Sequence, residues 1–289
     1  MRVGVGILPE DRWPVARTIW QRAEELGFDH AWSYDHLAWR SLRDAPWFAA
    51  IPTLAAAAQV TRRIRLGTLV ASPNFRHPVT LAKELVALDD ISEGRLIAGI
   101  GAGGVGWDAT MLGQEPWSTR ERADRFAEFV ELTDRLLREP AVSYEGRFYT
   151  ADGARTYPGC VQRPRVPLAI AGIGRRGMEL AARFGATWVT TGERGTANHI
   201  DPVTGAAAVG RQIGRLAEVC ERVGRDPATL DRLVLAGPEL DPGLASVEAF
   251  HETVGRYDAV GVTDFVVPWP RASEPYAADQ AVFEAIFSS

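Results

Sequence analysis

Two kinds of hydrophobic pattern alternate along the chain. Short runs rich in Val, Ile and Leu, such as residues 2–8 and 96–100, are typical of strands buried on both faces of a parallel sheet. The longer segments between them place apolar residues three or four positions apart, as Ile19, Ala23 and Leu26 are, which indicates amphipathic helices. The predicted strands are 2–8, 30–35, 63–70, 96–100, 167–172, 187–191, 230–236 and 263–267. The predicted helices are 13–27, 46–60, 78–94, 118–136, 174–184, 206–223, 246–259 and 273–287.

This alternation of strands and helices predicts an α/β fold, the parallel (β/α)8 or TIM barrel. No linker rich in Gly and Ser divides the chain, so we expect a single barrel domain over residues 1–289. We expect insertions after strands four and six. The first contains a hairpin at 142–150, because the alternation turns around Glu145 and Gly146, and the second is a polar loop at 193–205. An open doubly wound sheet is the alternative architecture.

The composition argues against several classes of partner. A formal charge of −5 and an isoelectric point near 5.6 disfavour nucleic acid, which requires a basic face. No apolar run reaches the length of a membrane span and the chain opens directly into a strand, so we expect neither a membrane partner nor a signal peptide. Cys160 and Cys220 are too few and too far apart for a disulfide framework or a zinc site. We therefore expect a cytoplasmic protein.

Catalytic groups in a TIM barrel lie at the carboxyl ends of its strands. Asp35 and His36 end the second predicted strand, where one group could orient a ring and the other could move a proton. The same residues could equally be an Asp that caps a turn and a surface His. No HxH, HExxH or GxSxG motif occurs, and neither Cys has a near partner. A bound cofactor that supplies the chemistry therefore fits better than metal or nucleophilic catalysis.

Two glycine-rich segments follow strands and could lie against a ligand. Gly101, Gly103 and Gly106 have GxGxxG spacing, but no acidic residue follows where a dinucleotide fingerprint requires one. The segment from Gly174 to Gly177 (GRRG) opens a helix, so its free N–H groups, the helix dipole and two arginines would hold a phosphate or another anion. A solvated arginine pair is the alternative. Aromatic residues around these loops suit a flat conjugated ligand, although core packing would also explain some of them.

Several segments resemble, in family order, the bacterial luciferase-like flavin and deazaflavin oxidoreductases. The matching segments are AEELGFDHAWSYDHL, RIRLGTLVASPNFRHPVTLAKELVALDDISEGRLIAGIGAG, RADRFAEFVELTDRLL, YEGRFY and PLAIAGIGRRGMELAARFGATWV. They cover roughly the first two-thirds of the chain, and the remainder matches only as barrel strands. The resemblance implies a (β/α)8 barrel with a cofactor ring across its mouth, a small-molecule substrate and a homodimer.

The resemblance also implies roles for single residues. In deazaflavin-dependent members the Asp-His pair faces the ring, which implies His36 as the proton donor or acceptor and Asp35 as the residue that fixes its tautomer or contacts the ring. A non-prolyl cis peptide that supports the ring falls at Leu69-Val70. The other implied cofactor contacts are Gly101, Ala102 and Gly103 beside the ring and its side arm, Asp108, and Ala171, Gly172, Ile173, Gly174 and Arg175 around the phosphate.

The resemblance favours an oxidoreductase that uses coenzyme F-420, a deazaflavin, and transfers a hydride between it and a small organic substrate. Two positions depart from the family members that act on sugar phosphates. Gly104 stands where those members have Glu, and Trp39 follows the Asp by four residues rather than five. We therefore expect a substrate other than a sugar phosphate. The alternatives are an FMN-dependent monooxygenase of the same family, which uses a separate reductase, and a non-catalytic barrel that binds a flavin.

Overall fold

Eight parallel strands close into a barrel in the computed structural model, which describes residues 1–193, 200–237 and 239–288. Around the barrel the strands follow the order β1-β10-β9-β8-β7-β4-β3-β2. Their bounds are β1 (Arg2–Ile7), β2 (His30–Ser33), β3 (Arg65–Thr68), β4 (Leu96–Gly101), β7 (Leu168–Ala171), β8 (Thr187–Thr190), β9 (Asp231–Leu235) and β10 (Asp264–Pro268). The predicted (β/α)8 fold is therefore confirmed, and the open-sheet alternative is wrong.

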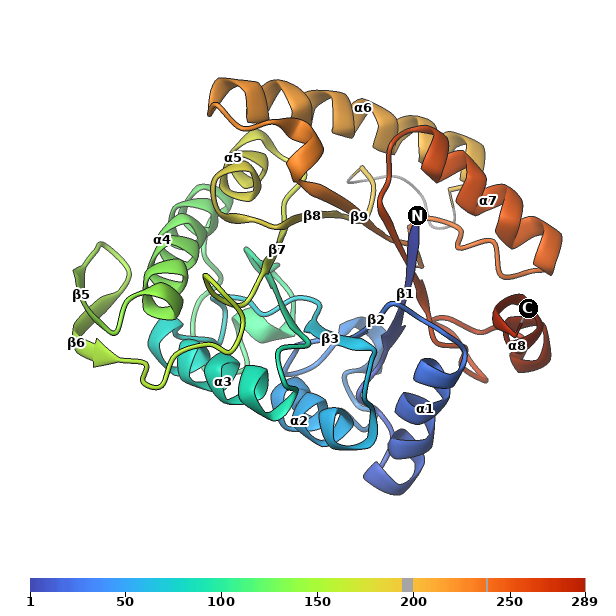
Figure 1. Cartoon of the computed structure of the whole chain (residues 1–289), viewed down its shortest axis with the longest axis horizontal. Helices are drawn as coiled ribbons and strands as arrows, with labels where there is room; N and C mark the ends of the chain where they lie inside the picture. Colours follow the sequence, from blue (N-terminus) through green and yellow to red (C-terminus); the bar gives the residue numbers. More distant parts are fainter. Residues whose placement is uncertain (194–199, 238, 289) are drawn as a thin grey trace.

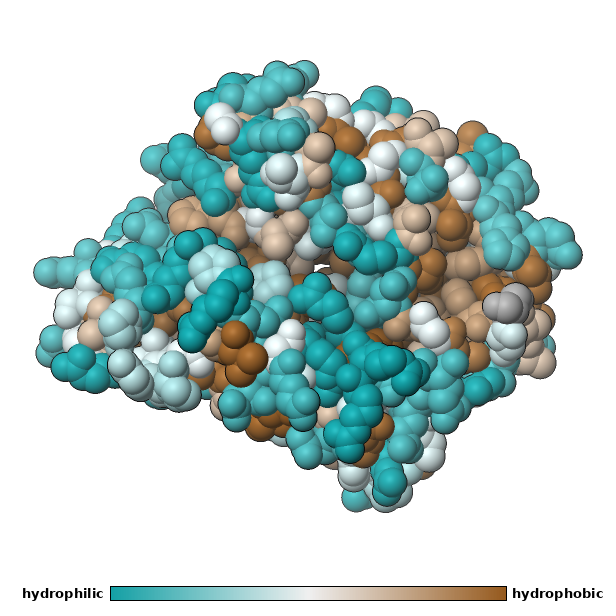
Figure 2. Space-filling model, in the orientation of Figure 1, coloured by the Kyte–Doolittle hydropathy of each residue, from teal (hydrophilic) through white to brown (hydrophobic). Residues whose placement is uncertain are grey.

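The helices form a ring outside the strands (Figure 1). Their bounds are α1 (Trp13–Glu25), α2 (Ala50–Val60), α3 (Pro78–Ile91), α4 (Thr119–Arg138), α5 (Arg175–Phe184), α6 (Pro202–Arg222), α7 (Val247–Ala259) and α8 (Gln280–Phe287). An ion pair of 2.9 Å between Arg22 and Glu284 joins α1 to α8, where the ring closes. The end of the barrel shown in Figure 2 is mainly hydrophilic, with smaller hydrophobic areas among the polar side chains. None of the described helices is long and apolar enough to cross a membrane.

The apolar core has two layers, one on each side of the strands. Leu81, Phe129 and other buried residues fill the space between the barrel and the helices. Trp32, Ile97 and Val266 fill the inside of the barrel. Each strand is therefore buried on both faces, which explains why the strands read as continuous apolar runs rather than as an alternation of apolar and polar residues.

A buried polar network lies at the amino ends of the strands. Arg2 donates two bonds of 2.7 Å to Asp264, and His30 Nε2 lies 3.0 Å from the same carboxylate. Trp32 Nε1 donates to His30 Nδ1 at 2.7 Å, so the ring proton of His30 is on Nε2 and points to Asp264. Burial alone would raise the pKa of Asp264, but hydrogen bonds from His30, Arg2 and Thr263 hold that pKa below its ordinary value. This end of the barrel is closed by a charged network, and the opposite end remains for chemistry.

The segment between β4 and β7 contains elements in addition to the one helix that a (β/α)8 barrel has at this point. It contains η2 (Trp107–Ala109), α4 and an antiparallel hairpin of β5 (Ala141–Glu145) and β6 (Thr150–Arg155). A hairpin is present as predicted, but its second strand begins at Thr150, where the predicted hairpin ends, so the turn lies at 146–149. A capping box begins α4, since Ser118 and Glu121 bond reciprocally there.

Three predicted helix starts are wrong by four residues or more. The helix predicted from 46 begins at Ala50, because Phe48 N donates to Pro9 O at 2.7 Å and the preceding residues stay extended. The helix predicted from 273 begins at Gln280, since Pro275 interrupts it and Asp279 provides the cap. The loop predicted at 193–205 is shorter, because α6 begins at Pro202, and residues 194–199 of it lie outside the described residues. Short 3-10 turns also occur at η1 (Arg40–Leu42) and η3 (Pro227–Thr229).

Candidate active site

Asp35 lies at the mouth of the barrel, two residues beyond β2, and binds an arginine rather than His36. Arg76 donates from Nε to Asp35 Oδ2 at 3.0 Å and from Nη2 to Oδ1 at 2.7 Å. Both side chains are largely buried, and Glu84 accepts a further bond of 2.9 Å from Arg76. This bidentate pair fixes the β3–α3 loop against the end of β2. The structure therefore corrects the prediction that Asp35 fixes the tautomer of His36, and contact with a cofactor ring stays a prediction for this residue.

His36 is held by Asp108, which comes from a different loop. Its Nδ1 hydrogen-bonds to Asp108 Oδ2, and Asp108 Oδ1 accepts from Leu37 N at 2.7 Å. Asp108 lies in η2 after β4 and is buried, whereas the His36 side chain is 29% exposed. A carboxylate on Nδ1 favours the tautomer that leaves Nε2 as an acceptor. Because no other bond to this ring is found among the described residues, Nε2 is the nitrogen available at the mouth.

The chain closes tightly beside the end of β3, at four positions predicted to contact a cofactor. The peptide bond between Leu69 and Val70 is cis, as the resemblance implied. A Cβ added at Gly101 would lie 2.6 Å from Val70 Cγ2 and 3.5 Å from Ala171 Cβ. A side chain at position 101 would therefore push Val70 aside, and the glycine lets the ends of β3, β4 and β7 lie against one another.

The β4 loop continues this surface past Ala102 and Gly103. Gly103 has a φ of +72°, and a Cβ there would lie 2.7 Å from the amide of Asn74. Asn74 Nδ2 donates to Gly104 O at 3.1 Å, which ties the β3 loop to the β4 loop. Asn74 and its neighbour Ser72 are both buried. These contacts fix the backbone of the predicted ring-binding loop.

The predicted phosphate loop is a close approach between strand and helix. A Cβ added at Gly172 would lie 2.7 Å from Gly177 Cα, so the end of β7 touches the first turn of α5. Gly174 is the N-cap of α5 and provides no side-chain cap, and no acidic residue lies in the first turn. Ile173 is half-buried in the same loop, and Arg175 is exposed and pairs with Glu179 at 3.0 Å. The uncapped N–H groups and the positive end of the helix dipole make this a suitable anion site.

Two unpartnered polar atoms near this surface were not predicted. The buried hydroxyl of Ser72, two residues beyond the cis peptide, has no hydrogen-bond partner. The same is true of Nε of Arg122, whose Nη1 donates to Gly103 O at 3.5 Å. Buried polar groups without partners are rare and indicate a missing ligand or water. A flat heteroatom-rich ring with an anionic side arm therefore fits the residues present. Of the two residues, only Ser72 could have been found from the sequence, because it follows the cis bond that the resemblance implies.

An aromatic wall borders the mouth on the side of His36. Trp39 stacks between Trp47, at 6.1 Å between ring centroids, and Tyr276, at 5.7 Å. Trp47 lies edge-on to His36 at 6.4 Å and donates from Nε1 to its carbonyl oxygen at 2.8 Å. Burial raises the pKa of Tyr34, another ring of this wall, to about 12, so its phenol stays neutral at physiological pH. The predicted cluster of aromatic residues is therefore both a packing element and one side of the mouth.

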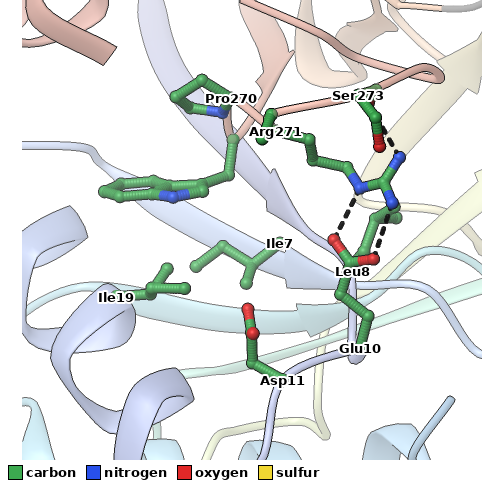
Figure 3. Close-up of a pocket in the computed structure, with 10 residues that line it drawn as sticks. Ile7, Leu8, Glu10, Asp11, Ile19, Pro270, Arg271 and Ser273 are labelled. Carbon is green, nitrogen blue, oxygen red and sulfur yellow. Dashed lines mark hydrogen bonds and ion pairs between the residues drawn. The ribbon is translucent and has the colours of Figure 1, made fainter. Parts of the chain in front are cut away.

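A small pocket of about 290 Å³ lies between the loops that follow β1 and β10. Glu10 and Arg271 bond to each other across its edge at 2.6 and 2.8 Å, and Asp11 points into it (Figure 3). Burial, followed by the nearby charge of Glu10, raises the pKa of Asp11. None of the predicted site residues lines this pocket, so it is separate from the surface described above.

The sequence of the chain matches a known protein family. Residues 1–259 match the family model of the luciferase-like monooxygenases. The chain belongs to this family. The family that the sequence segments indicated is therefore confirmed. The match extends beyond those segments into β9 and α7.

Two curated relatives are similar in sequence. An F-420-dependent glucose-6-phosphate dehydrogenase of Amycolatopsis mediterranei is 32% identical over 210 residues, which cover 71% of this chain and 60% of that protein. An F-420-dependent hydroxymycolic acid dehydrogenase of Mycobacterium tuberculosis is 30% identical over 224 residues, which cover 72% of this chain and 59% of that protein. The aligned part is thus less than two-thirds of the length of each relative.

A solved structure is similar in fold. It is described as an F-420-dependent secondary alcohol dehydrogenase in complex with an F-420-acetone adduct. It superposes with a TM-score of 0.80 over 99% of this chain and 97% of that chain, at 20% sequence identity. At this level of identity the likeness shows the shared barrel and leaves the activity to be argued from the site.

Proposed function

We propose that the protein is a coenzyme F-420-dependent oxidoreductase that acts on a small organic substrate. The observation that carries the proposal is His36, which Asp108 holds at the mouth with Nε2 available as an acceptor. When bound, the deazaflavin supplies the hydride chemistry at C5 of its ring. The activities of the two relatives named above support this choice of cofactor.

Three parts of the chain would hold the cofactor. The surface formed by Val70, Gly101 and Ala171 would lie against the flat ring, and the cis bond lies within it. The unpartnered hydroxyl of Ser72 would hydrogen-bond to the ring. The first turn of α5, with Arg175 beside it, would bind the phosphate through its N–H groups.

The residues of the chain would carry the accompanying proton. In the oxidation of an alcohol, Nε2 of His36 would accept the hydroxyl proton as the carbonyl forms, and in the reverse direction it would return that proton. Asp108 keeps the ring in the tautomer and orientation that this transfer requires. The buried pair of Asp35 and Arg76 holds the loops that flank His36, which keeps the reacting groups in place.

Titration with F-420 and with FMN distinguishes this function from the alternatives. Only the true cofactor is expected to bind tightly and to be reduced or reoxidised with a substrate. Tight binding and turnover of FMN would instead support the monooxygenase. Cofactor binding without any hydride donor or acceptor would support the non-catalytic barrel.

The His36→Ala variant tests the role of the base. We expect it to keep the affinity for F-420 and to lose about 10²- to 10⁴-fold in kcat, the usual contribution of general acid–base catalysis. His251→Ala is the control, because that histidine is exposed on α7. Unchanged turnover in His36→Ala would refute the assignment.

We also propose a cytoplasmic homodimer. The proposed oligomer rests on the family resemblance, and light scattering after size-exclusion chromatography measures it. The proposed location is supported by Cys160 and Cys220, which are both free and buried.

A further inference from the structure

A groove of about 920 Å³ opens beside the aromatic wall, between the loops that follow β2, β9 and β10. Arg40 lines it from the β2 loop, Asp241 and Leu244 from the β9 loop, and Tyr276 from the β10 loop. None of the predicted cofactor residues lines the groove. Its Tyr276 belongs to the aromatic wall that borders His36, so the groove is a candidate for the substrate, in an inference that rests on the proposed function.

The charge in this groove disfavours an anionic ligand. Asp241, Glu274 and Asp279 bring three carboxylates to its lining, against the one guanidinium of Arg40. That guanidinium pairs with Glu239 at 2.8 Å, so its charge is already compensated. A phosphate or carboxylate in the groove would meet net negative charge at short range.

The uncharged part of the lining is mostly apolar. Leu244, Pro268 and Val282 contribute aliphatic surface, and the ring of Tyr276 forms one wall. Apolar surface of this kind stabilises a ligand in proportion to the area that it removes from water. The body of the ligand is therefore expected to be apolar.

A pair of buried hydroxyl groups stands at the wall of the groove. The hydroxyls of Tyr34 and Tyr276 lie 2.9 Å apart, and both side chains are buried. The two groups carry two protons, but their mutual bond uses only one. In the part of the chain that the structure describes, no other group bonds to either hydroxyl. One donor is therefore left for an oxygen atom of a ligand.

The position of Tyr276 directs this donor toward both the groove and the base. A Cβ on Gly237, which also lines the groove, would lie 2.6 Å from Cε1 of Tyr276 and 3.3 Å from its hydroxyl oxygen. The hydroxyl end of the phenol thus lies at the groove wall. Tyr34 lies edge-on to His36 with 6.5 Å between the ring centroids, so the hydroxyl pair lies on the same side of the mouth as the proposed base.

We propose that the groove binds an uncharged, largely apolar alcohol or ketone, and that the Tyr34–Tyr276 hydroxyl pair recognises its oxygen. The pair donates to a ketone oxygen or to the lone pair of an alcohol. The acidic lining excludes phosphorylated substrates. Tyr276 is thereby a specificity-determining residue.

Ligand-detected NMR on the full-length protein tests the inference with cyclohexanol and glucose 6-phosphate as probes. We expect cyclohexanol to bind at least 10-fold more tightly than glucose 6-phosphate. Tyr276→Phe keeps the ring stack and removes the hydroxyl, and should weaken cyclohexanol binding by about 2- to 12-fold, the net effect of one neutral hydrogen bond. Tyr157→Phe is the matched control, because Tyr157 is 75% exposed.

The charge argument is tested at an exposed position, where folding is not at risk. Glu274→Lys should increase the affinity for glucose 6-phosphate several-fold, because a positive charge replaces one of the carboxylates of the groove lining. The inference is overturned if cyclohexanol fails to bind, if glucose 6-phosphate binds as tightly, or if Tyr276→Phe has no effect.

These measurements need no cofactor, so they are independent of the test of function. Cyclohexanol binding that depends on Tyr276 supports the inference even where F-420 fails to bind. Failure of F-420 to bind would refute the proposed function but would leave the inference about the groove intact.

Discussion

The contact between Asp108 and His36 gives a sharp test of the proposed proton transfer. In Asp108→Asn the side-chain oxygen can still accept from the N–H groups of Leu37 and Ala38, which lie at 2.7 and 3.4 Å from Oδ1. The new amide nitrogen, however, carries protons and would face Nδ1 of His36. Nδ1 must then accept, and the proton of the neutral ring moves to Nε2. The variant therefore blocks the atom that the mechanism needs as a base while keeping the loop in place.

The magnitude follows from the contacts that change. A hydrogen bond to a charged group is worth about 1.5–3 kcal/mol, and each 1.4 kcal/mol is tenfold in rate. Without the carboxylate, the imidazolium that forms as His36 accepts the proton loses this charge-assisted stabilisation, so kcat for alcohol oxidation should fall by about 10- to 150-fold. The inverted tautomer adds to this loss, and in a Ser-His-Asp triad the equivalent change lowers kcat about 10⁴-fold. Two of the three contacts of the carboxylate remain, so the free energy of unfolding should change by about 1 kcal/mol or less.

The assay is steady-state oxidation with F-420, together with cofactor titration and urea unfolding. We expect kcat to fall, with KM, cofactor affinity and the unfolding midpoint close to those of the wild type. Asp108→Glu should restore part of the rate, because a carboxylate returns to the side of Nδ1. A kcat in Asp108→Asn within twofold of the wild type would refute the role of Asp108, and a large loss of stability would show that the contact is mainly structural.

Two further perturbations test the phosphate loop and the buried network. Gly172→Ala places a Cβ 2.7 Å from Gly177 Cα, so α5 must move away from β7. We expect the free energy of unfolding, measured with urea, to fall by about 1–3 kcal/mol. We also expect weaker F-420 binding in a fluorescence titration. The pKa of Asp264 is held below its ordinary value by His30 and Arg2. It therefore contributes stability that is complete above the unfolded value, about pH 4, and is lost as the pH falls below it. Asp264→Asn should lower the urea midpoint at pH 6 and reduce the further drop between pH 6 and pH 3, whereas an equal drop in both proteins would contradict the role of Asp264.

The sequence alone was sufficient for a parallel sheet covered by helices, and its closure into a barrel was shown by the strand order of the structure. Runs such as 96–100 are apolar on both faces and are separated by amphipathic segments, a pattern that only a parallel sheet covered by helices satisfies. Local chemistry also placed the predicted helix starts at Ser118 and Gly174, which are the N-caps of α4 and α5. Boundaries failed where longer-range contacts decide, as at Ala50, where a bond from Phe48 to Pro9 keeps the chain extended.

The pairing of the site residues was decided by the tertiary structure. Asp35 and His36 are adjacent, and adjacency suggested that one orients the other. On an extended strand end, however, neighbouring side chains point to opposite sides. Asp35 therefore turns to Arg76, and His36 turns into the mouth to meet Asp108, 72 residues away.

The same physical reason applies to the proposed substrate wall. Tyr34 follows the second strand of the chain and Tyr276 follows the last, 242 residues later. Closure of the barrel places β10 beside β1 and β1 beside β2, so the loops of these strands meet at one side of the mouth. Periodicity determines which residues face inward on each strand, and only the closed barrel determines which of them meet.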